Sequence, residues 1–232
     1  MKQNVLILCA GIACIAAAAG AADRTWNGAS TVDSNWSRSE NWGGTAPAGG
    51  DALYFGGSTR LNNTNDFDAG TPFSGITFSA GAGAFALAGT GITLDGDLCN
   101  FSTSSKTIHL PLALSGDRMI FGSNAAFTVN GIISGMGGLC AAVTNTLTLT
   151  GDNTYEGTTT VSNGCRLLIT HPNALGSTAG GTRVYGRTGS SLRLQGGITV
   201  DEPITLVGQI PPWINCMTAG SGSNIITGTI YK

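Results

Sequence analysis

The chain has 232 residues, of which 36 are glycine, about 16% against an ordinary usage of about 7%. Charged residues make up 10% of the chain and the formal net charge is −2, so the chain lacks the basic field that holds a nucleic-acid backbone or an anionic membrane surface. Hydrophobic residues reach 41%, which excludes a disordered chain and, with the high glycine content, predicts a folded, β-rich protein.

Residues 1–22 predict a cleaved export signal. Lys2 supplies a positive start, an apolar run follows over residues 5–19, and residues 19–22 are small and suited to cleavage. The run is shorter than the roughly 20 residues that span a bilayer, and no stop-transfer charges follow it. We therefore expect a mature chain that begins near Asp23, has no membrane span and is secreted or placed at the cell surface.

Residues 23–91 predict an N-terminal cap and the first coils of the fold. Trp26, Trp36 and Trp42 lie in this segment among Gly, Ser and Asn residues. One interpretation is a hydrophobic lid over the first coil, and the other is a set of aromatic faces that stack against sugar rings. The large apolar surface of three tryptophans favours the lid.

Residues 92–232 contain short alternating apolar segments that end in glycine, and helical periodicity is nearly absent. The clearest segments are residues 92–96, 112–116, 127–131, 147–151, 192–196 and 204–208. From Gly96 to Gly208 the steps average 16 residues and range from 10 to 22. We interpret one step as one strand with its turn.

Each segment has apolar side chains on one face and mainly Thr, Ser or Asn on the other, and glycine permits the sharp change of direction that follows. One such strand cannot bury its apolar face alone, but strands stacked about 4.8 Å apart form a continuous core. The pattern predicts an all-β fold, a right-handed parallel β-helix or β-solenoid of short strands that end in glycine. A β-sandwich is the alternative, although it usually has tighter hairpin signals.

The stretch from Thr146 to Gly164 resembles the autotransporter-associated β-strand repeat (passenger-associated transport repeat), whose pattern is T-L-T-L-x-G-x-N-T-Y-x-G-x-T-x-V-x-x-G-x-L. The matching positions are Thr146, Leu147, Thr148, Leu149, Gly151, Asn153, Thr154, Tyr155, Gly157, Thr159, Val161 and Gly164. The resemblance is best over residues 132–208 and extends loosely to the tryptophan-rich opening. Cys140 and Arg166 depart from the pattern.

The repeat also has a physical interpretation. Leu147, Leu149 and Val161 are expected to point inward. Asn153 is expected at a corner, where its amide can bond local backbone or stack with other asparagines, and Tyr155 is expected to close the core edge rather than bind a ligand. The resemblance implies that such repeats assist export of a surface passenger and carry no catalytic residue.

Four cysteines follow the predicted signal: Cys99, Cys140, Cys165 and Cys216. Their separations of 41, 25 and 51 residues match no compact disulfide or zinc spacing, although an exported chain can oxidise its thiols. Chance spacing or buried thiols are favoured. The alternative is a bond between Cys140 and Cys165, if stacked coils bring these two residues together.

No catalytic, cofactor-binding or metal-binding residue is predicted. Two acidic pairs, Asp66 with Asp68 and Asp95 with Asp97, fit neither an EF-hand nor a Gly-rich calcium repeat. The only two histidines, His109 and His171, belong to no catalytic motif. A polysaccharide-degrading β-helix enzyme remains the competing class. Its test is whether five residues converge in one groove, namely Asp95, Asp97, Asp117, Arg118 and His109.

These observations predict a structural passenger segment of an autotransporter-like bacterial surface protein, stalk-like or adhesin-like, that assists passenger export and folding. The alternative is a secreted β-helix protein that binds, or less readily degrades, polysaccharide. The expected partner is a surface glycan or a host or matrix component, with no nucleic acid, no metal and no cofactor. Residues 220–230 resemble the opening of another repeat, so further repeats are expected to follow.

Overall fold

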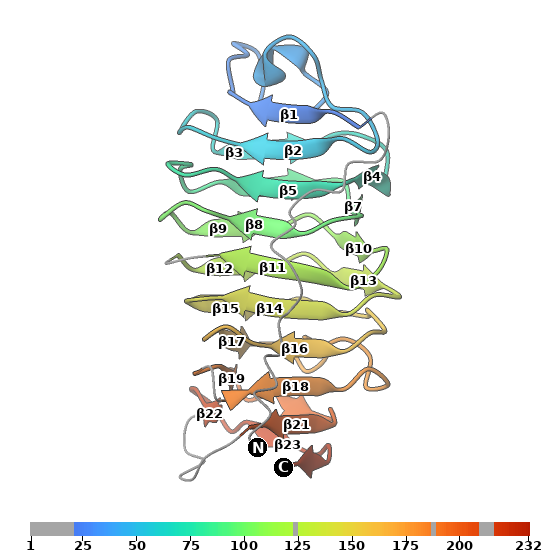
Figure 1. Ribbon diagram of the computed structural model, residues 1–232, viewed down its shortest axis with the longest axis vertical. Coiled ribbons are helices and arrows are strands. Elements are labelled where there is room, and N and C mark those ends of the chain that lie inside the picture. Colours follow the sequence, from blue (N-terminus) through green and yellow to red (C-terminus); the bar gives the residue numbers. More distant parts are fainter. Residues whose placement is uncertain (1–20, 123–124, 187–188, 209–215) are drawn as a thin grey trace, which may run out of the picture.

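The computed structural model describes residues 21–122, 125–186, 189–208 and 216–232, which form 24 short strands and one 3-10 helix, η1 (Ser39–Trp42). The strands stack as rungs along the long axis of the molecule (Figure 1). The ladders between them are parallel throughout this part of the chain. The predicted all-β parallel β-solenoid is therefore confirmed. All of the predicted export signal except its last two residues lies outside the described residues.

Three parallel sheets form the sides of the solenoid. Sheet A consists of β1 (Asp23–Trp26), β2 (Ala52–Phe55), β5 (Gly75–Phe78), β8 (Leu98–Asn100), β11 (Arg118–Gly122), β14 (Leu139–Val143), β16 (Thr159–Val161), β18 (Thr182–Tyr185), β21 (Ile204–Val207) and β24 (Ile230–Tyr231). Sheet B consists of β3 (Asn62–Asn65), β6 (Ala86–Gly89), β9 (Lys106–Ile108), β12 (Phe127–Val129), β15 (Thr146–Leu149), β17 (Arg166–Ile169), β19 (Ser191–Leu194) and β22 (Met217–Ala219). Sheet C consists of β4 (Thr71–Phe73), β7 (Ile92–Leu94), β10 (Leu112–Leu114) and β13 (Ile133–Gly135), and β20 (Thr199–Val200) pairs with β23 (Ile225–Ile226).

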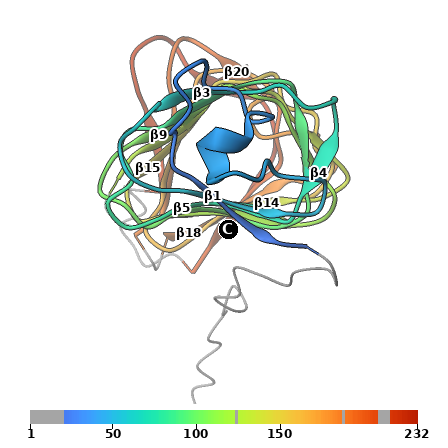
Figure 2. The same ribbon diagram turned by 90° about the horizontal axis from the view of Figure 1, so that it is seen from above.

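The chain visits sheets A, B and C in turn, and the view along the axis places the three sheets on different sides (Figure 2). Beyond β13 the third side continues as hydrogen-bonded backbone, since Thr154 N donates to Ile133 O and Ser177 N donates to Tyr155 O. In the register of sheet A, from Leu53 to Leu206, stacked partners are 20 to 23 residues apart. One full turn therefore has about this length. The 16-residue glycine step does not equal it, because glycines stand at more than one corner of each turn.

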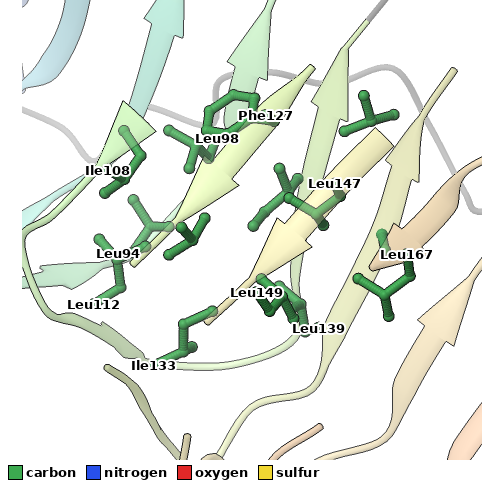
Figure 3. Close-up of a cluster of buried hydrophobic side chains, with 14 of the residues drawn as sticks. Leu94, Leu98, Ile108, Leu112, Phe127, Ile133, Leu139, Leu147, Leu149 and Leu167 are labelled. Carbon is green, nitrogen blue, oxygen red and sulfur yellow. The ribbon is translucent and has the colours of Figure 1, made fainter. Parts of the chain in front are cut away.

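The core fills the space enclosed by the sheets. Alternate residues point inward, so that Leu53, Ile76, Leu98 and Ile120 stack in one buried column of sheet A. Figure 3 shows side chains of the middle rungs meeting in the interior. Burial of each such Leu or Ile side chain stabilises the fold by roughly 1.5–3 kcal/mol. Leu147, Leu149 and Val161 are buried, as predicted.

Glycine at the corner between sheets C and A permits close stacking of the rungs. A Cβ atom at Gly137 would collide with the backbone of Gly116, one at Gly157 with the backbone of Gly137 and Gly138, and one at Gly180 with the backbone of Gly157. Any larger residue at these positions must push two rungs apart. Such close contacts between backbones explain why glycine occupies these corner positions.

We expect the substitution Gly157→Ala to lower the free energy of unfolding by about 2–3 kcal/mol, because backbone must move to make room for the methyl group. Gly56→Ala is the matched control, since a Cβ at Gly56 meets no atom within 4 Å. The control is expected to leave the protein unchanged or stabilise it by about 0.4–1 kcal/mol. Urea unfolding followed by far-UV circular dichroism measures both changes, and equal midpoints for the two variants would contradict the steric explanation.

Candidate interaction surface

The three tryptophans of the opening segment form a buried lid. Their rings are at most 5% exposed, and all three pack against Phe55 with ring centroids 5.5 to 5.9 Å apart. Trp36 Nε1 donates to Asn63 Oδ1 at 2.7 Å, and Trp42 Nε1 donates to Trp36 O at 2.7 Å. Helix η1 lies over the end of the solenoid (Figure 2). The lid interpretation is confirmed, and stacking of these rings on sugars is wrong because no ring face is accessible.

Four of the five residues of the predicted enzyme test lie at one corner of the solenoid, and the fifth, His109, lies at another. Asp97 and Asp117 lie at the corner between sheets C and A, where their carboxylates accept backbone N–H groups of Met119 and Gly138 at 2.8 and 2.7 Å. Asp95 and Arg118 lie at the same corner. His109 instead follows β9 at the corner between sheets B and C. The carboxylates of Asp97 and Asp117 thus tie successive rungs together.

The acidic pair of Asp66 and Asp68 also has a structural setting. The Asp66 carboxylate accepts hydrogen bonds from the backbone N–H and the hydroxyl of Ser37, at 2.8 and 2.5 Å, and so joins the cap to the first rung. The Asp68 carbonyl accepts the hydroxyl of Thr71 at 2.7 Å. In the described part of the chain, no three His, Cys, Asp or Glu side chains cluster as metal ligands.

Two signature residues of the repeat are buried. Tyr155 is fully enclosed, its hydroxyl lies 2.5 Å from Thr159 Oγ1, and burial raises the pKa of its phenol. Tyr155 therefore closes the core edge, as predicted. Asn153 accepts from Ile133 N at 2.8 Å and donates to Ala174 O at 2.7 Å. Its amide joins three rungs through the backbone and does not stack on other asparagines.

Cys140 and Cys165 are not partners. Cys140 lies on the outer face of β14, where its Sγ is 3.7 Å from Ser162 Oγ, whereas Cys165 is buried just before β17 on another side of the solenoid. None of the four cysteines in the described residues forms a disulfide, so the alternative pairing is wrong. Burial raises the pKa of the Cys165 thiol to about 11, which keeps it protonated at neutral pH.

Two buried ionisable side chains lie inside the solenoid where the sequence pattern shows no signal for them. Lys106 Nζ donates to Ser102 Oγ at 2.6 Å and to Ser104 O at 2.7 Å, and burial lowers the pKa of its amine to about 8. Glu202 accepts the hydroxyl of Thr182 at 2.9 Å, and burial raises the pKa of its carboxyl to about 7. Both are enclosed in the core, so neither side chain contacts a macromolecular ligand at the surface.

The outward face of sheet B is mostly neutral and polar. Its central column consists of residues that stack in register on consecutive rungs, namely Thr107, Thr128, Thr148, Leu168 and Arg193. Beside this column, Thr150 Oγ1 donates to Asn130 Oδ1 at 2.9 Å, and the Asn130 amide lies 3.3 Å from His109 Nδ1. Contacts between rungs therefore hold part of this polar surface in place.

The outward face of sheet A is different in character. The rings of Phe101 and Phe121 have centroids 5.9 Å apart, and Phe101 is 43% exposed. Met119 stands on the same side of the sheet, two residues before Phe121. Around β8 and β11, this outward face of sheet A is therefore more apolar than the outward face of sheet B.

The sequence pattern does not identify the outward residues of sheet B as candidate binding residues. It indicates the tryptophans and the acidic pairs instead. A signal is present nevertheless, because the middle residue of each Leu-x-Leu segment must point outward when its neighbours point inward. Which middle residues share a face becomes known only from the register between rungs.

Comparison with known proteins yields one informative match. The chain is 28% identical over 209 residues to a Brucella suis protein described as "Adhesin BmaC autotransporter". This chain is therefore similar to an autotransporter adhesin. The match covers 81% of this chain and 6% of the adhesin, so the chain spans only a small part of that relative.

No protein-family model and no solved structure matches the chain. The resemblance to the autotransporter-associated β-strand repeat consequently stays a prediction, while similarity to an autotransporter passenger protein is supported. No helix among the described residues is long and apolar enough to cross a membrane.

Proposed function

We propose that the chain is an adhesin-like, surface-exposed or secreted segment of an autotransporter-type protein. The observation that carries the proposal is the similarity to an autotransporter adhesin over 81% of this chain. The parallel β-solenoid supports it, because inward residues hold the core while outward residues on long flat sides are open to contact. A non-enzymatic role is part of the proposal, supported by the structural hydrogen bonds of Asp97 and Asp117.

The proposal includes export through cleavage of residues 1–22 and assistance to folding of the passenger during export. The positive start and apolar run of the N-terminal segment support the first part. The second part is supported by the ladder, in which each rung of the solenoid bonds to its neighbours along the axis. Rungs of this kind can fold one after another as the chain emerges.

Fractionation of cells that produce the protein natively tests the proposal. An antibody against residues 140–208 is expected to detect the chain in the medium or at the surface, and protease added to intact cells is expected to remove the surface signal. Detection only after lysis would contradict a surface role. In the same assay, Gly157→Ala is expected to lower the exported fraction relative to Gly56→Ala if rung stacking assists export.

A further inference from the structure

We propose that the outward face of sheet B, over strands β9, β12, β15, β17 and β19, binds an acidic polysaccharide. The inference rests on the proposed surface role, because a chain at the surface can meet such a ligand. It is carried by two arginines, by a row of hydroxyl side chains and by the absence of carboxylates from the described strands of this sheet.

The described strands of sheet B carry basic but no acidic side chains on their outward face. None of the eight described strands of sheet B contains Asp or Glu. Arg166 and Arg193 belong to the paired strands β17 and β19, and both point outward because the residues next to them, such as Leu167 and Leu192, are buried in the core. In a chain of net charge −2, this local excess of cations is complementary to an anionic ligand.

No ion pair among the described residues engages Arg193. Its Nε atom is buried and makes no hydrogen bond to the described residues, so the Nη groups are the donors that remain for a ligand. Arg166 donates one hydrogen bond at 3.3 Å, from Nη1 to Thr146 Oγ1. Guanidinium groups of this kind bind carboxylates through paired N–H donors.

The three threonines of the central column, here called the threonine column, supply the neutral part of the site. Thr107, Thr128 and Thr148 stand in register on three consecutive rungs, which places their hydroxyls at a repeat of about 4.8 Å along the solenoid axis. Hydroxyls donate and accept hydrogen bonds, as sugar hydroxyls do. The column and the two arginines lie on one continuous side, so an extended chain along the axis can contact both.

The charge density of the face favours a polysaccharide over a nucleic acid. A nucleic acid carries one charge per nucleotide and is held by many cations. Sheet B offers two arginines among neutral side chains, mostly hydroxyl and amide groups with Leu168 between Thr148 and Arg193, which suits a ligand with many hydroxyls and widely spaced carboxylates. Hyaluronan, in which every second sugar carries a carboxylate, is a suitable probe.

Binding of the purified full chain to hyaluronan oligosaccharides, measured by calorimetry at low and high salt, tests the proposal. We expect binding that weakens as salt rises and no comparable binding to neutral dextran. The double variant Arg166→Gln/Arg193→Gln is expected to lose affinity by about tenfold or more. Arg183→Gln, an exposed arginine on the outer face of sheet A, is the matched control and is expected to change affinity by less than about twofold.

A separate variant tests the contribution of the threonine column to binding. Thr128→Val keeps the shape of the side chain and is expected to weaken hyaluronan binding while leaving its salt dependence unchanged, because no charge is removed. Circular dichroism and the urea midpoint establish that each variant is folded.

Three results would overturn the proposal: no binding of hyaluronan by the folded chain, equal loss of affinity in Arg183→Gln, or equal competition by single-stranded DNA. Because this assay uses purified protein, its failure leaves the fractionation result for the proposed function intact.

Discussion

Replacing Trp36 with alanine is expected to lower the free energy of unfolding by about 3–5 kcal/mol. The Trp36 ring is fully buried and lies 5.7 to 6.2 Å, centroid to centroid, from the rings of Phe55, Phe73 and Trp42. Its loss leaves a cavity and also leaves the Asn63 amide without its indole donor. Since the lid covers the first rung, the damage is expected to spread into the N-terminal rungs.

Urea unfolding followed by far-UV circular dichroism measures the effect of Trp36→Ala, and hydrogen exchange of the amides of β2 locates it. The control is Val32→Ala in the same segment, because Val32 is 71% exposed and is expected to change stability by less than about 0.5 kcal/mol. An unchanged midpoint in Trp36→Ala would show that the lid does not stabilise the solenoid.

The second large effect concerns pH and the buried carboxyl of Glu202. Burial raises the pKa of this group from its ordinary 4.5 to about 7, and the neighbouring Asp201 adds to the rise, against the lowering effect of the Thr182 hydroxyl. The folded chain therefore binds a proton that the unfolded chain releases between about pH 4.5 and pH 7. Stability is expected to fall as pH rises through this interval, by about 2–3 kcal/mol, and to change little from this cause above it.

Glu202→Gln removes the ionisation and keeps an oxygen that can accept the Thr182 hydroxyl. The variant is expected to be about 2–3 kcal/mol more stable than the parent at pH 8 and equal to it at pH 4. Hydrogen exchange of the amides of Thr182 and Ile204, which bond to Pro203 O and Thr229 O, reports on these C-terminal rungs directly. Glu156→Gln, at an exposed corner, is the control for the loss of one carboxylate. A profile that keeps its slope in Glu202→Gln would assign the pH dependence to another group.

Much of the fold follows from residue pattern. Segments such as Leu147-Thr-Leu149 expose one apolar face, which a stack of parallel strands can bury, and glycines mark the corners where backbones meet. Burial of Trp36 and Tyr155 also follows, because large aromatic rings gain most from leaving water. The length of one turn does not follow from the glycine steps, since glycine stands at several corners of each turn.

The candidate surface is harder to predict from pattern. Arg193 and Thr148 share one column of sheet B because β19 pairs with β17 and β17 pairs with β15, and these pairings depend on how many residues each intervening turn contains. Local periodicity shows that both residues point outward but not that they face the same ligand.

Alternation of apolar and polar residues with recurring glycine favoured a stack of short strands, and the cluster of tryptophans favoured a lid, because the residue types themselves carry these signals. The register between rungs, which joins residues 25 apart between β17 and β19, places Arg166 diagonally across from Arg193, and packing between distant segments encloses Lys106 and Glu202 in the core. Such placement depends on packing among distant segments, and no local pattern encodes it.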